Sequence, residues 1–339
     1  MAGVPTALKA ATLLPTLRFI TCGSVDDGKS TLIGRLLHDT RSIYDDQLTS
    51  LASDSKKHGT TGERVDLALL LDGLLAEREQ GITIDVAYRF FAVPGRRFIV
   101  ADTPGHEQYT RNMATGASTA SLAVLLVDAR KGIAVQTCRH ARIASLIGIR
   151  QIVVAVNKMD LVGFNPAVFR RIDDEFRAFS ADLGFTAVTS IPMCALDGDN
   201  VMLASERTPW YSGTTFLDCL MAAEVHTSDV DSKFRMPVQW VCRPNQEFRG
   251  FAGRVARGSI APGDPVRILP SGVESTVKSV VAWQGDLPLA GAGDSVMLTL
   301  ATEVDASRGA VIVATTAPPE VADQFQVHLL WMGEHDLVP

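Results

Sequence analysis

A glycine-rich octapeptide, Gly-Ser-Val-Asp-Asp-Gly-Lys-Ser at residues 23–30, constrains the fold of this chain more than any other stretch. It fits the pattern G-x-x-x-x-G-K-[ST], in which successive backbone N–H groups surround anionic oxygens. An apolar run at residues 17–22 precedes it and reads as a buried strand, while a helical pattern opens at Thr31. Phosphate would then lie at a helix N-terminus, where free N–H groups and the helix dipole favour negative charge. The octapeptide therefore predicts a phosphate-binding loop, or P-loop, between a strand and a helix.

The residues of this loop have separate expected roles. Gly23 and Gly28 allow the tight turn, Lys29 is expected to reach the β- and γ-phosphates, and Ser30 is expected to offer its hydroxyl to Mg²⁺. We predict that the whole loop and the residue after it bind the nucleotide: Gly23, Ser24, Val25, Asp26, Asp27, Gly28, Lys29, Ser30 and Thr31.

Length and charge limit the classes of protein to which the chain can belong. At 339 residues it is too long for one ordinary hydrophobic core, which predicts two or three domains. The net charge of −6 gives no bulk attraction to nucleic acid or to an anionic membrane. The leucine-rich run at residues 67–75 is too short to span a bilayer. We therefore expect neither a nucleic-acid partner nor a membrane.

The cysteines and the N-terminus bear on the compartment. The five cysteines are scattered and never spaced as C-x-x-C, which favours reduced thiols in a cytoplasmic protein over disulfides or a zinc site: Cys22, Cys138, Cys194, Cys219 and Cys242. Residues 1–16 are small and apolar but are broken by prolines, so we expect a flexible tail rather than a signal peptide.

Two further loops carry residues suited to a γ-phosphate. Thr83 begins an expected strand and offers a second hydroxyl ligand for Mg²⁺, the usual device of a nucleotide-sensing loop. Asp102 ends another expected strand and can hold the metal through water. Gly105 can bring its N–H close to the γ-phosphate, and His106 is placed to orient the attacking water. Thr103 and Pro104 complete this nucleotide-binding loop.

A fourth motif is expected to read the base. The run Asn157-Lys158-Met159-Asp160 follows an expected strand. The Asp160 carboxylate can accept N1–H and the exocyclic amino group of guanine, whereas adenine has no N1–H and would leave a buried carboxylate unpaired. The loop Cys194-Ala195-Leu196, after the next expected strand, is where a further guanine contact is expected.

The order of the expected elements predicts an α/β P-loop GTPase domain, with a mostly parallel sheet and helices on both faces, followed by a small antiparallel β-barrel. In the first part we expect strands at 17–22, 83–91, 97–101, 122–128, 152–156 and 187–193 and helices from Thr31 and at 65–79, 136–147, 166–183 and 214–223. In the second we expect strands at 238–243, 250–255, 265–269, 275–283, 295–300 and 310–314, with a last strand at 325–332. The expected domains are a tail at 1–16, the GTP-binding domain at 17–228, a linker at 229–236, the barrel at 237–317 and the start of an incomplete third β domain at 318–339.

Together and in this order, the four motifs resemble those of the translation-factor GTPases, typified by elongation factor Tu. The Ser-Val-Asp-Asp interior of the P-loop makes the chain more similar to the GTPase subunits of bacterial sulfate adenylyltransferases. Further runs resemble those subunits too, at residues 38–40, 58–60, 76–81, 106–113, 209–213, 243–245 and 248–250. One departure is Cys194, where that family usually has serine; because the contact there is largely through backbone N–H, we expect a modest loss at most.

The resemblance implies a division of labour between two subunits of a nucleotidyltransferase. A smaller partner subunit binds ATP and sulfate and forms adenosine 5′-phosphosulfate and pyrophosphate, the first step of sulfate assimilation. The GTPase subunit of this heterodimer hydrolyses GTP with Mg²⁺ and couples that free energy to the adenylation. Within the site, His106, Lys29, Thr83 and Gly105 are the expected catalytic residues. Asp26 matches an aspartate that supports a monovalent cation in related GTPases.

Three alternatives remain open from the sequence. The chain could be a translation factor that binds tRNA and the ribosome, against which its acidic balance argues. It could be the N-terminal part of a bifunctional adenylyltransferase and adenosine 5′-phosphosulfate kinase, including those that supply sulfate for nodulation signals. It could also be a truncated interaction protein that binds GTP without stimulating sulfate activation.

Overall fold

The computed structural model describes residues 14–43, 55, 67, 83, 85–225, 233–244, 248–283, 285–327 and 329–333. It divides into two units, one of residues 1–225 with 330–339 and one of residues 226–329. The helix expected at 65–79 lies outside the described residues except for Leu67. Among the helices that are described, none is long and apolar enough to cross a membrane.

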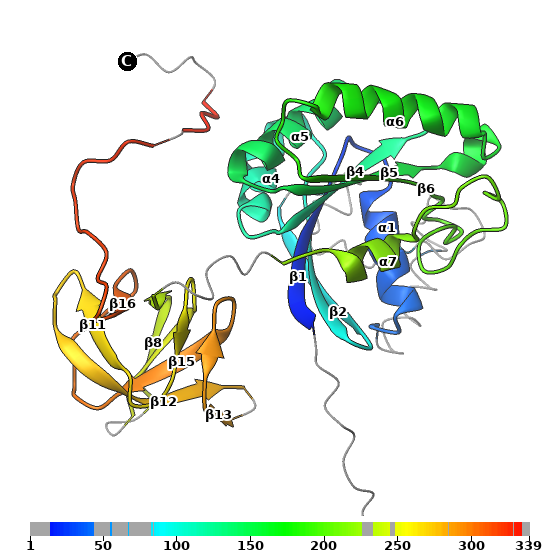
Figure 1. The fold of residues 1–339 in the computed structure, drawn as a ribbon. Helices are drawn as coiled ribbons and strands as arrows, with labels where there is room; N and C mark the ends of the chain where they lie inside the picture. Colours follow the sequence, from blue (N-terminus) through cyan, green and yellow to red (C-terminus); the bar gives the residue numbers. More distant parts are fainter. Residues whose placement is uncertain are drawn as a thin grey trace, which may run out of the picture. The chain divides into compact units, whose positions relative to one another are not determined.

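The first unit is built on a six-stranded sheet with the order β2-β3-β1-β4-β5-β6 (Figure 1). The strands are β1 (Leu14–Cys22), β2 (Ala87–Val93), β3 (Arg96–Asp102), β4 (Leu122–Asp128), β5 (Gln151–Asn157) and β6 (Ala187–Pro192). Only β2 is antiparallel to its neighbour. Every residue of β4 and β5 is buried, as expected of parallel strands between two layers of helices.

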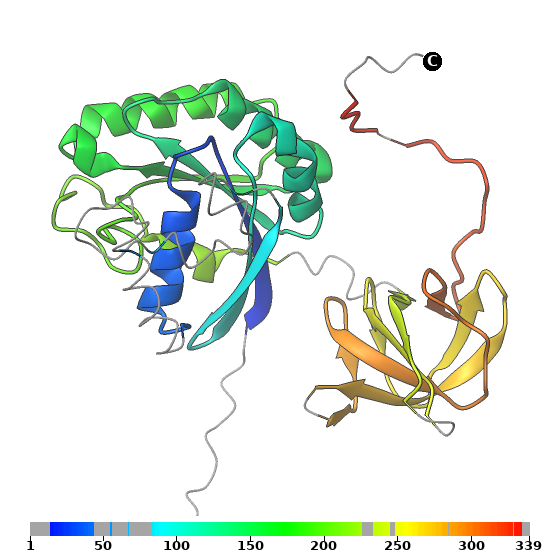
Figure 2. The ribbon, with the colours of Figure 1, turned by 180° about the vertical axis from the view of Figure 1, so that it is seen from behind.

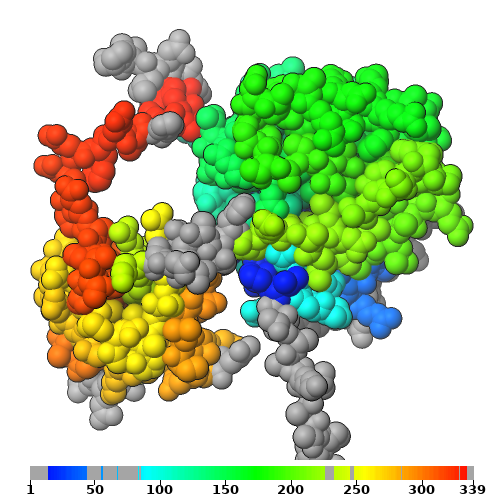
Figure 3. Space-filling model, in the orientation of Figure 1, coloured from blue at the N-terminus to red at the C-terminus, as the bar shows by residue number. Residues whose placement is uncertain are grey.

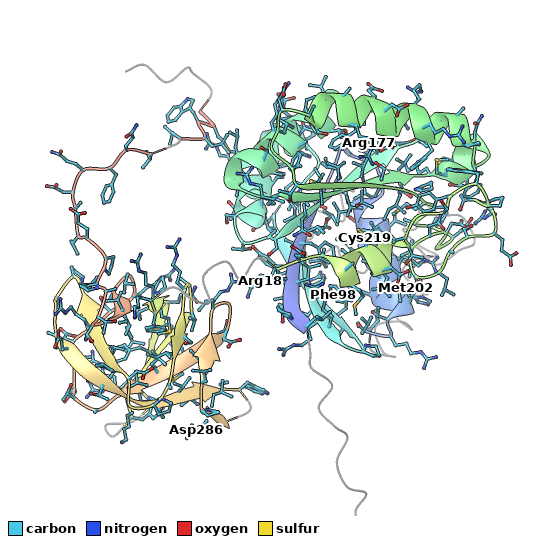
Figure 4. All side chains as sticks on the ribbon, in the orientation of Figure 1. Arg18, Phe98, Arg177, Met202, Cys219 and Asp286 are labelled. Carbon is cyan, nitrogen blue, oxygen red and sulfur yellow. The ribbon has the colours of Figure 1, made fainter. Side chains whose placement is uncertain are left out.

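Helices cover both faces of this sheet. Figure 2, seen from behind, shows α1 (Lys29–Asp39) and α7 (Phe216–Ala222) on one face, opposite α4 (Thr110–Ala117), α5 (Val135–Ile147) and α6 (Pro166–Ser180). Phe98, labelled in Figure 4, packs in the core under α1 and α7, and Cys219 of α7 lies against the same cluster. The other face is filled by side chains of α4, α5 and α6, and the green residues of α6 form an outer surface of the unit in Figure 3. The predicted α/β GTPase-type layering is confirmed.

Several element boundaries differ from the sequence prediction. Strand β1 begins at Leu14, inside the segment expected to be a tail. Strand β2 begins at Ala87 rather than at residue 83, because Ala87 pairs with Asp102 and β3 ends there. Helix α6 ends at Ser180 instead of Leu183, whose N–H turns back to the Ser180 carbonyl at 3.0 Å.

The second unit is an antiparallel sheet in the order β7-β16-β11-β12-β15-β9-β8, with β13 paired to β12. It curves round one apolar core that includes Met236, Phe251, Val266 and Ile312. The strands are β7 (Arg235–Pro237), β8 (Trp240–Cys242), β9 (Gly250–Arg254), β11 (Pro265–Leu269), β12 (Glu274–Ala282), β13 (Gly285–Leu287), β15 (Ser295–Leu300) and β16 (Val311–Ala314), with a separate pair of β10 (Ser259–Ile260) and β14 (Ala290–Gly291). The short β7, β10, β13 and β14 were not predicted, since two or three residues carry no alternation to read.

The strand predicted at 325–332 is wrong for the residues that the structure describes there. Residues 325–327 and 329–332 form no strand, and Phe325 is 76% exposed. A strand needs a neighbour for its backbone hydrogen bonds, and none is present within the described part of the chain. The carbonyl of Met332 instead accepts a hydrogen bond from Arg111 of α4 at 2.9 Å.

Candidate functional site

The P-loop at residues 23–30 turns from β1 into α1 with an unusual backbone. Gly23, Asp26 and Gly28 have φ values of 146°, 66° and 94°, in the region that glycine adopts most easily. The Ser24 N–H donates to the Asp27 carboxylate at 2.7 Å, which closes the turn from within. Helix α1 starts at Lys29 with no side-chain cap and no acidic residue in its first turn. Its first N–H groups are therefore available to an anion, as the sequence predicted.

Lys29 is buried at the centre of this loop. Its Nζ donates to the Ser24 carbonyl at 2.8 Å and to that of Gly23 at 3.4 Å. Burial lowers the pKa of Lys29, and the nearby Asp102 and Asp27 carboxylates act against this. A buried ammonium requires anionic or carbonyl partners, so the charge, the carbonyls and the open helix terminus together suit a polyphosphate.

Gly105 lies directly against the P-loop. A Cβ at this position would come within 2.8 Å of the Ser24 carbonyl carbon and 2.9 Å of the Gly23 oxygen, and would collide with Nζ of Lys29. Any larger residue would fill the space beside the lysine. Gly105 therefore lies beside Lys29, the residue expected to reach the γ-phosphate.

A hydroxyl and a buried carboxylate meet at the next corner of the site. The Ser30 hydroxyl donates to Oδ2 of Asp102 at 3.4 Å, and Thr21 donates to Oδ1 at 3.2 Å. Burial raises the pKa of Asp102 to about 6, against the lowering effects of Lys29 and these hydroxyls. Oxygen donors of this kind suit Mg²⁺. Thr83 is half-buried ahead of β2 and does not belong to this network among the described residues.

The loop after β3 holds the remaining predicted residues of the γ-phosphate side. Thr103 is buried and donates to the Thr21 carbonyl at 2.6 Å, and the buried Pro104 leads to Gly105. His106 caps the short helix η2 (Glu107–Tyr109), where its Nδ1 accepts the Gln108 N–H at 3.3 Å. The imidazole is thus held by its own turn, one residue after the glycine that touches the P-loop.

Asn157, at the end of β5, joins three loops of the site. Its Nδ2 donates to the Asp27 carbonyl at 2.8 Å, and its Oδ1 accepts the Ala195 N–H at 2.9 Å. The first residue of the predicted base-reading motif therefore connects the P-loop to the loop at 194–196. Its contacts place the candidate phosphate-binding and guanine-binding parts side by side.

Lys158 is held by the P-loop and by an aspartate that the sequence reading missed. It adopts φ 60° and donates from Nζ to the Asp26 carbonyl, while the buried Asp128 lies 3.2 Å from Nζ. Burial acts to raise the pKa of Asp128, but hydrogen bonds from Arg130 and the charge of Lys158 outweigh it and lower the pKa to about 2. Asp128 thus remains an anion that fixes the lysine.

The loop at 194–196 is tied to the same site. Burial raises the pKa of Cys194 to about 12, helped by a hydrogen bond to the Asp160 carboxylate. Thiol and carboxylate are therefore neighbours, while the Met159 N–H donates to the Met193 carbonyl at 3.1 Å. From α1, Arg35 donates to the carbonyls of Ala195 and Leu196, the first at 3.2 Å.

Sequence reasoning overlooked three residues that hold this site: Arg35, Asp128 and His140. Their partners are distant in the chain, as with His140 and Gly23, which are 117 residues apart. A weak signal existed for His140, because Gln136 precedes it by four residues and thus shares its helix face.

Comparisons with known proteins give several relatives of this chain. Residues 14–231 match the model of the elongation factor Tu GTP-binding domain. The chain is 60% identical over 323 residues to sulfate adenylyltransferase subunit 1 of Methylorubrum extorquens strain PA1, covering 95% of this chain and 69% of that protein. It is 58% identical over 335 residues to the same subunit of Tolumonas auensis, covering 99% and 71%.

A third relative is longer. The chain is 60% identical over 337 residues to the bifunctional enzyme NodQ of Rhizobium sp. strain N33. The match covers 99% of this chain but only about half, 52%, of that protein. Among solved structures, the fold is similar to the GTP-bound Ski7 GTPase-like domain of S. cerevisiae, with a TM-score of 0.61, 18% identity and coverage of 90% and 76%. It is also similar to bacterial selenocysteine-specific elongation factor, with a TM-score of 0.54, 24% identity and coverage of 89% and 45%.

Proposed function

This chain belongs to the family of the elongation factor Tu GTP-binding domain and, within it, to the sulfate adenylyltransferase subunit 1 proteins, and we propose that it is the GTP-hydrolysing subunit of that enzyme. The observation that carries the proposal is the joining of the phosphate loop to the base-reading motif by Asn157, which contacts Asp27 and Ala195 at once. One nucleotide, with its triphosphate at the helix α1 terminus and its base near Asp160, suits this arrangement.

We infer that hydrolysis rests on positioning and electrostatics. Lys29 and the N–H groups of the P-loop stabilise the negative charge that develops on the phosphoryl oxygens, because they are fixed before the reaction begins. Gly105 admits the γ-phosphate beside Lys29, and His106 orients the water for in-line attack. These roles are supported by the bare helix terminus and by the space that a Cβ at residue 105 would fill.

The residues that we propose for Mg²⁺ are Ser30 and Thr83 directly and Asp102 through water. When bound, the ion would neutralise part of the negative charge on the phosphate oxygens. The contact of Ser30 with Asp102 supports this donor set. For a monovalent cation we propose the neighbourhood of Asp26, whose exposed side chain and positive φ set it at the outer edge of the P-loop.

The partner that we propose is the smaller subunit that binds ATP and sulfate. There, adenosine 5′-phosphosulfate and pyrophosphate form, and GTP hydrolysis on this chain supplies the driving free energy. We place the pair in the cytoplasm, in keeping with five cysteines that are all free thiols.

Copurification tests the proposal directly. The full chain is expressed with the ATP- and sulfate-binding subunit, and adenosine 5′-phosphosulfate synthesis is measured with and without GTP. We expect a stable complex whose synthesis rate rises with GTP and falls when Asp160 is replaced by Asn. Stable GTP binding with no complex and no stimulation would overturn the proposal in favour of a GTP-binding interaction protein.

A second candidate follows from the similarity to NodQ, which matches this chain at the same 60% identity as the subunit 1 protein. In that case the chain would be the GTPase part of a bifunctional protein. Adding adenosine 5′-phosphosulfate and ATP to the complex distinguishes the two, since only a linked or associated kinase would consume both.

A further inference from the structure

A buried histidine on α5 contacts the start of the P-loop and belongs to none of the predicted motifs. His140 has no exposed surface, and its Nδ1 accepts the Gly23 N–H at 3.1 Å. Gly23 has φ 146°, and a Cβ there would lie 2.6 Å from the Leu126 carbonyl oxygen. The backbone is thus confined at this point, and His140 satisfies the amide that begins the loop.

The acceptor role of Nδ1 determines the state of the ring. Burial, together with the charges of Lys29 and Arg139, lowers the pKa of His140 to about 3, so the imidazole is neutral. A neutral imidazole has one N–H and one lone-pair nitrogen. Since Nδ1 accepts from Gly23, the proton resides on Nε2, which must donate to the neighbouring group.

That neighbour is the side-chain amide of Gln136, one helical turn earlier. In this structure the Gln136 amide nitrogen lies 2.9 Å from Nε2 of His140, and Arg139 donates to the amide oxygen at 3.0 Å. Rotation of the amide group exchanges its oxygen and nitrogen, so the single acceptor oxygen serves either His140 or Arg139. The two donors therefore compete for one oxygen.

Arg139 has a second partner at the edge of the site. Its guanidinium lies 3.2 Å from the carboxylate of Glu107, and Glu107 is the residue after His106, in the turn that His106 caps. Nη1 of Arg139 contacts the Gln136 oxygen and the Glu107 carboxylate at the same time. The contacts from Gly23 to Glu107 thus run unbroken from the P-loop to the turn of the expected catalytic histidine.

We propose that His140 is a positioning residue for the P-loop, coupled through Gln136 and Arg139 to the turn at Glu107. Through this series of contacts, the nucleotide bound at the P-loop influences the conformation of the turn next to His106. The conformation of that turn in turn influences nucleotide binding, because coupling between two sites is reciprocal. This inference rests on the proposed GTP site. It adds a residue that binds no nucleotide but holds the loop that does.

Two replacements of His140 separate a hydrogen-bond role from simple packing. In His140→Asn, the amide oxygen lies near the place of Nδ1 and can accept the Gly23 N–H. In His140→Gln, the amide lies near the place of Nε2 and leaves the Gly23 N–H without its acceptor. We expect His140→Gln to weaken binding of a fluorescent GDP by about tenfold and His140→Asn to restore most of it. The thermal unfolding midpoint of each nucleotide-free variant reports on packing alone.

The coupling is tested on the exposed part of the chain of contacts. Arg139→Gln should change the ratio of affinities for a non-hydrolysable GTP analogue and for GDP by about threefold, and this change should vanish in the His140→Asn background, where the link to Gln136 is lost. Arg142 lies on the same helix, but its guanidinium stacks on Phe179. Arg142→Gln removes the same charge from α5 and serves as the matched control.

The outcomes divide cleanly. If the wild-type chain binds neither nucleotide, the proposed function fails. If it binds both while His140→Gln and His140→Asn behave alike, the positioning role is wrong. If Arg139→Gln changes the ratio of GTP-analogue to GDP affinity no more than Arg142→Gln does, the coupling is wrong even where the hydrogen-bond role of His140 stands. Arg139 is partly exposed, so this comparison does not depend on how the His140 variants fold.

Discussion

Nδ2 of Asn157 lies 2.8 Å from the carbonyl oxygen of Asp27, so the motif expected to read the base also holds the loop expected to bind the phosphates. The same side chain accepts the N–H of Ala195. The loop proposed to bind the phosphates and the motif proposed to read the base are therefore joined by one side chain. A change at Asn157 is expected to disturb both.

Replacement of Asn157 by Ala should lower the free energy of unfolding of the first unit by about 2–3 kcal/mol, because a buried carbonyl and a buried N–H lose their partners. GTP affinity should fall at the same time. Chemical denaturation and a nucleotide titration measure the two effects. In the control, Asn165→Ala removes only the cap of α6 and should cost about 1 kcal/mol with GTP affinity unchanged; equal losses of affinity in both variants would contradict a joint role for Asn157.

The Asp160→Asn variant should prefer xanthine nucleotides to guanine nucleotides. An amide offers a donor where the carboxylate accepts, so it suits the xanthine oxygen and leaves guanine with opposed donors. We expect a loss of GTP affinity of about 100-fold or more, with a gain for xanthosine triphosphate. Competition binding with the two nucleotides checks this. An unchanged GTP affinity would remove Asp160 from base recognition.

Removal of the His106 imidazole should separate hydrolysis from binding. In His106→Ala the turnover number should drop by about 100-fold while GTP still binds, since the proposed role is only to orient water. His38→Ala removes an exposed imidazole on α1 and is the control. Phosphate release under single-turnover conditions gives the rate, and a wild-type rate in His106→Ala would rule the residue out of the mechanism.

Loss of the Lys29 ammonium should act on binding instead. Lys29→Ala removes the buried charge that we propose faces the phosphates, and it should weaken GTP affinity by about 100-fold. Lys278→Ala, on the exposed side of β12, removes the same charge elsewhere. If both variants bind GTP like the wild type, the loop at residues 23–30 is not the phosphate site.

Asp102 gives the nucleotide-free chain a specific pH dependence. Its pKa is raised from the ordinary 3.8 to about 6 by burial, so the folded chain holds this proton more tightly than the unfolded chain does. The resulting stabilisation is complete below about pH 4 and is lost as the pH rises through 6. Relative to wild type, Asp102→Asn should therefore gain about 3 kcal/mol in free energy of unfolding between about pH 4 and pH 7.

The comparison with the variant isolates this group. The lowered pKa of His140 acts with the opposite sign in both proteins and cancels in the difference. Urea unfolding at several pH values without nucleotide measures the difference in free energy of unfolding between the two proteins. A difference between the two proteins that does not change with pH would show that Asp102 ionises normally in the folded chain.

Much of the fold could be predicted because its signals are local. The fully apolar runs of β4 and β5 reveal strands buried on both faces, and Gly148 ends α5 where the sequence placed it. Strand pairing could not be predicted, because a strand's partner is distant in the sequence. The strand expected at 325–332 has the right alternation but no neighbour within the described residues, and β13 pairs with β12 through only three residues.

For the candidate site, too, some features could be predicted from local sequence and others could not. The candidate chemical residues Lys29, Asp102 and Asp160 could be proposed from the sequence, because each lies at or just beyond the end of a strand, where a parallel sheet gathers its loops. The contacts that hold these residues in place became visible only in the tertiary structure. Arg35 reaches the Ala195 carbonyl across 160 residues and His140 reaches Gly23 across 117, because strand order, which no local pattern encodes, brings these loops together.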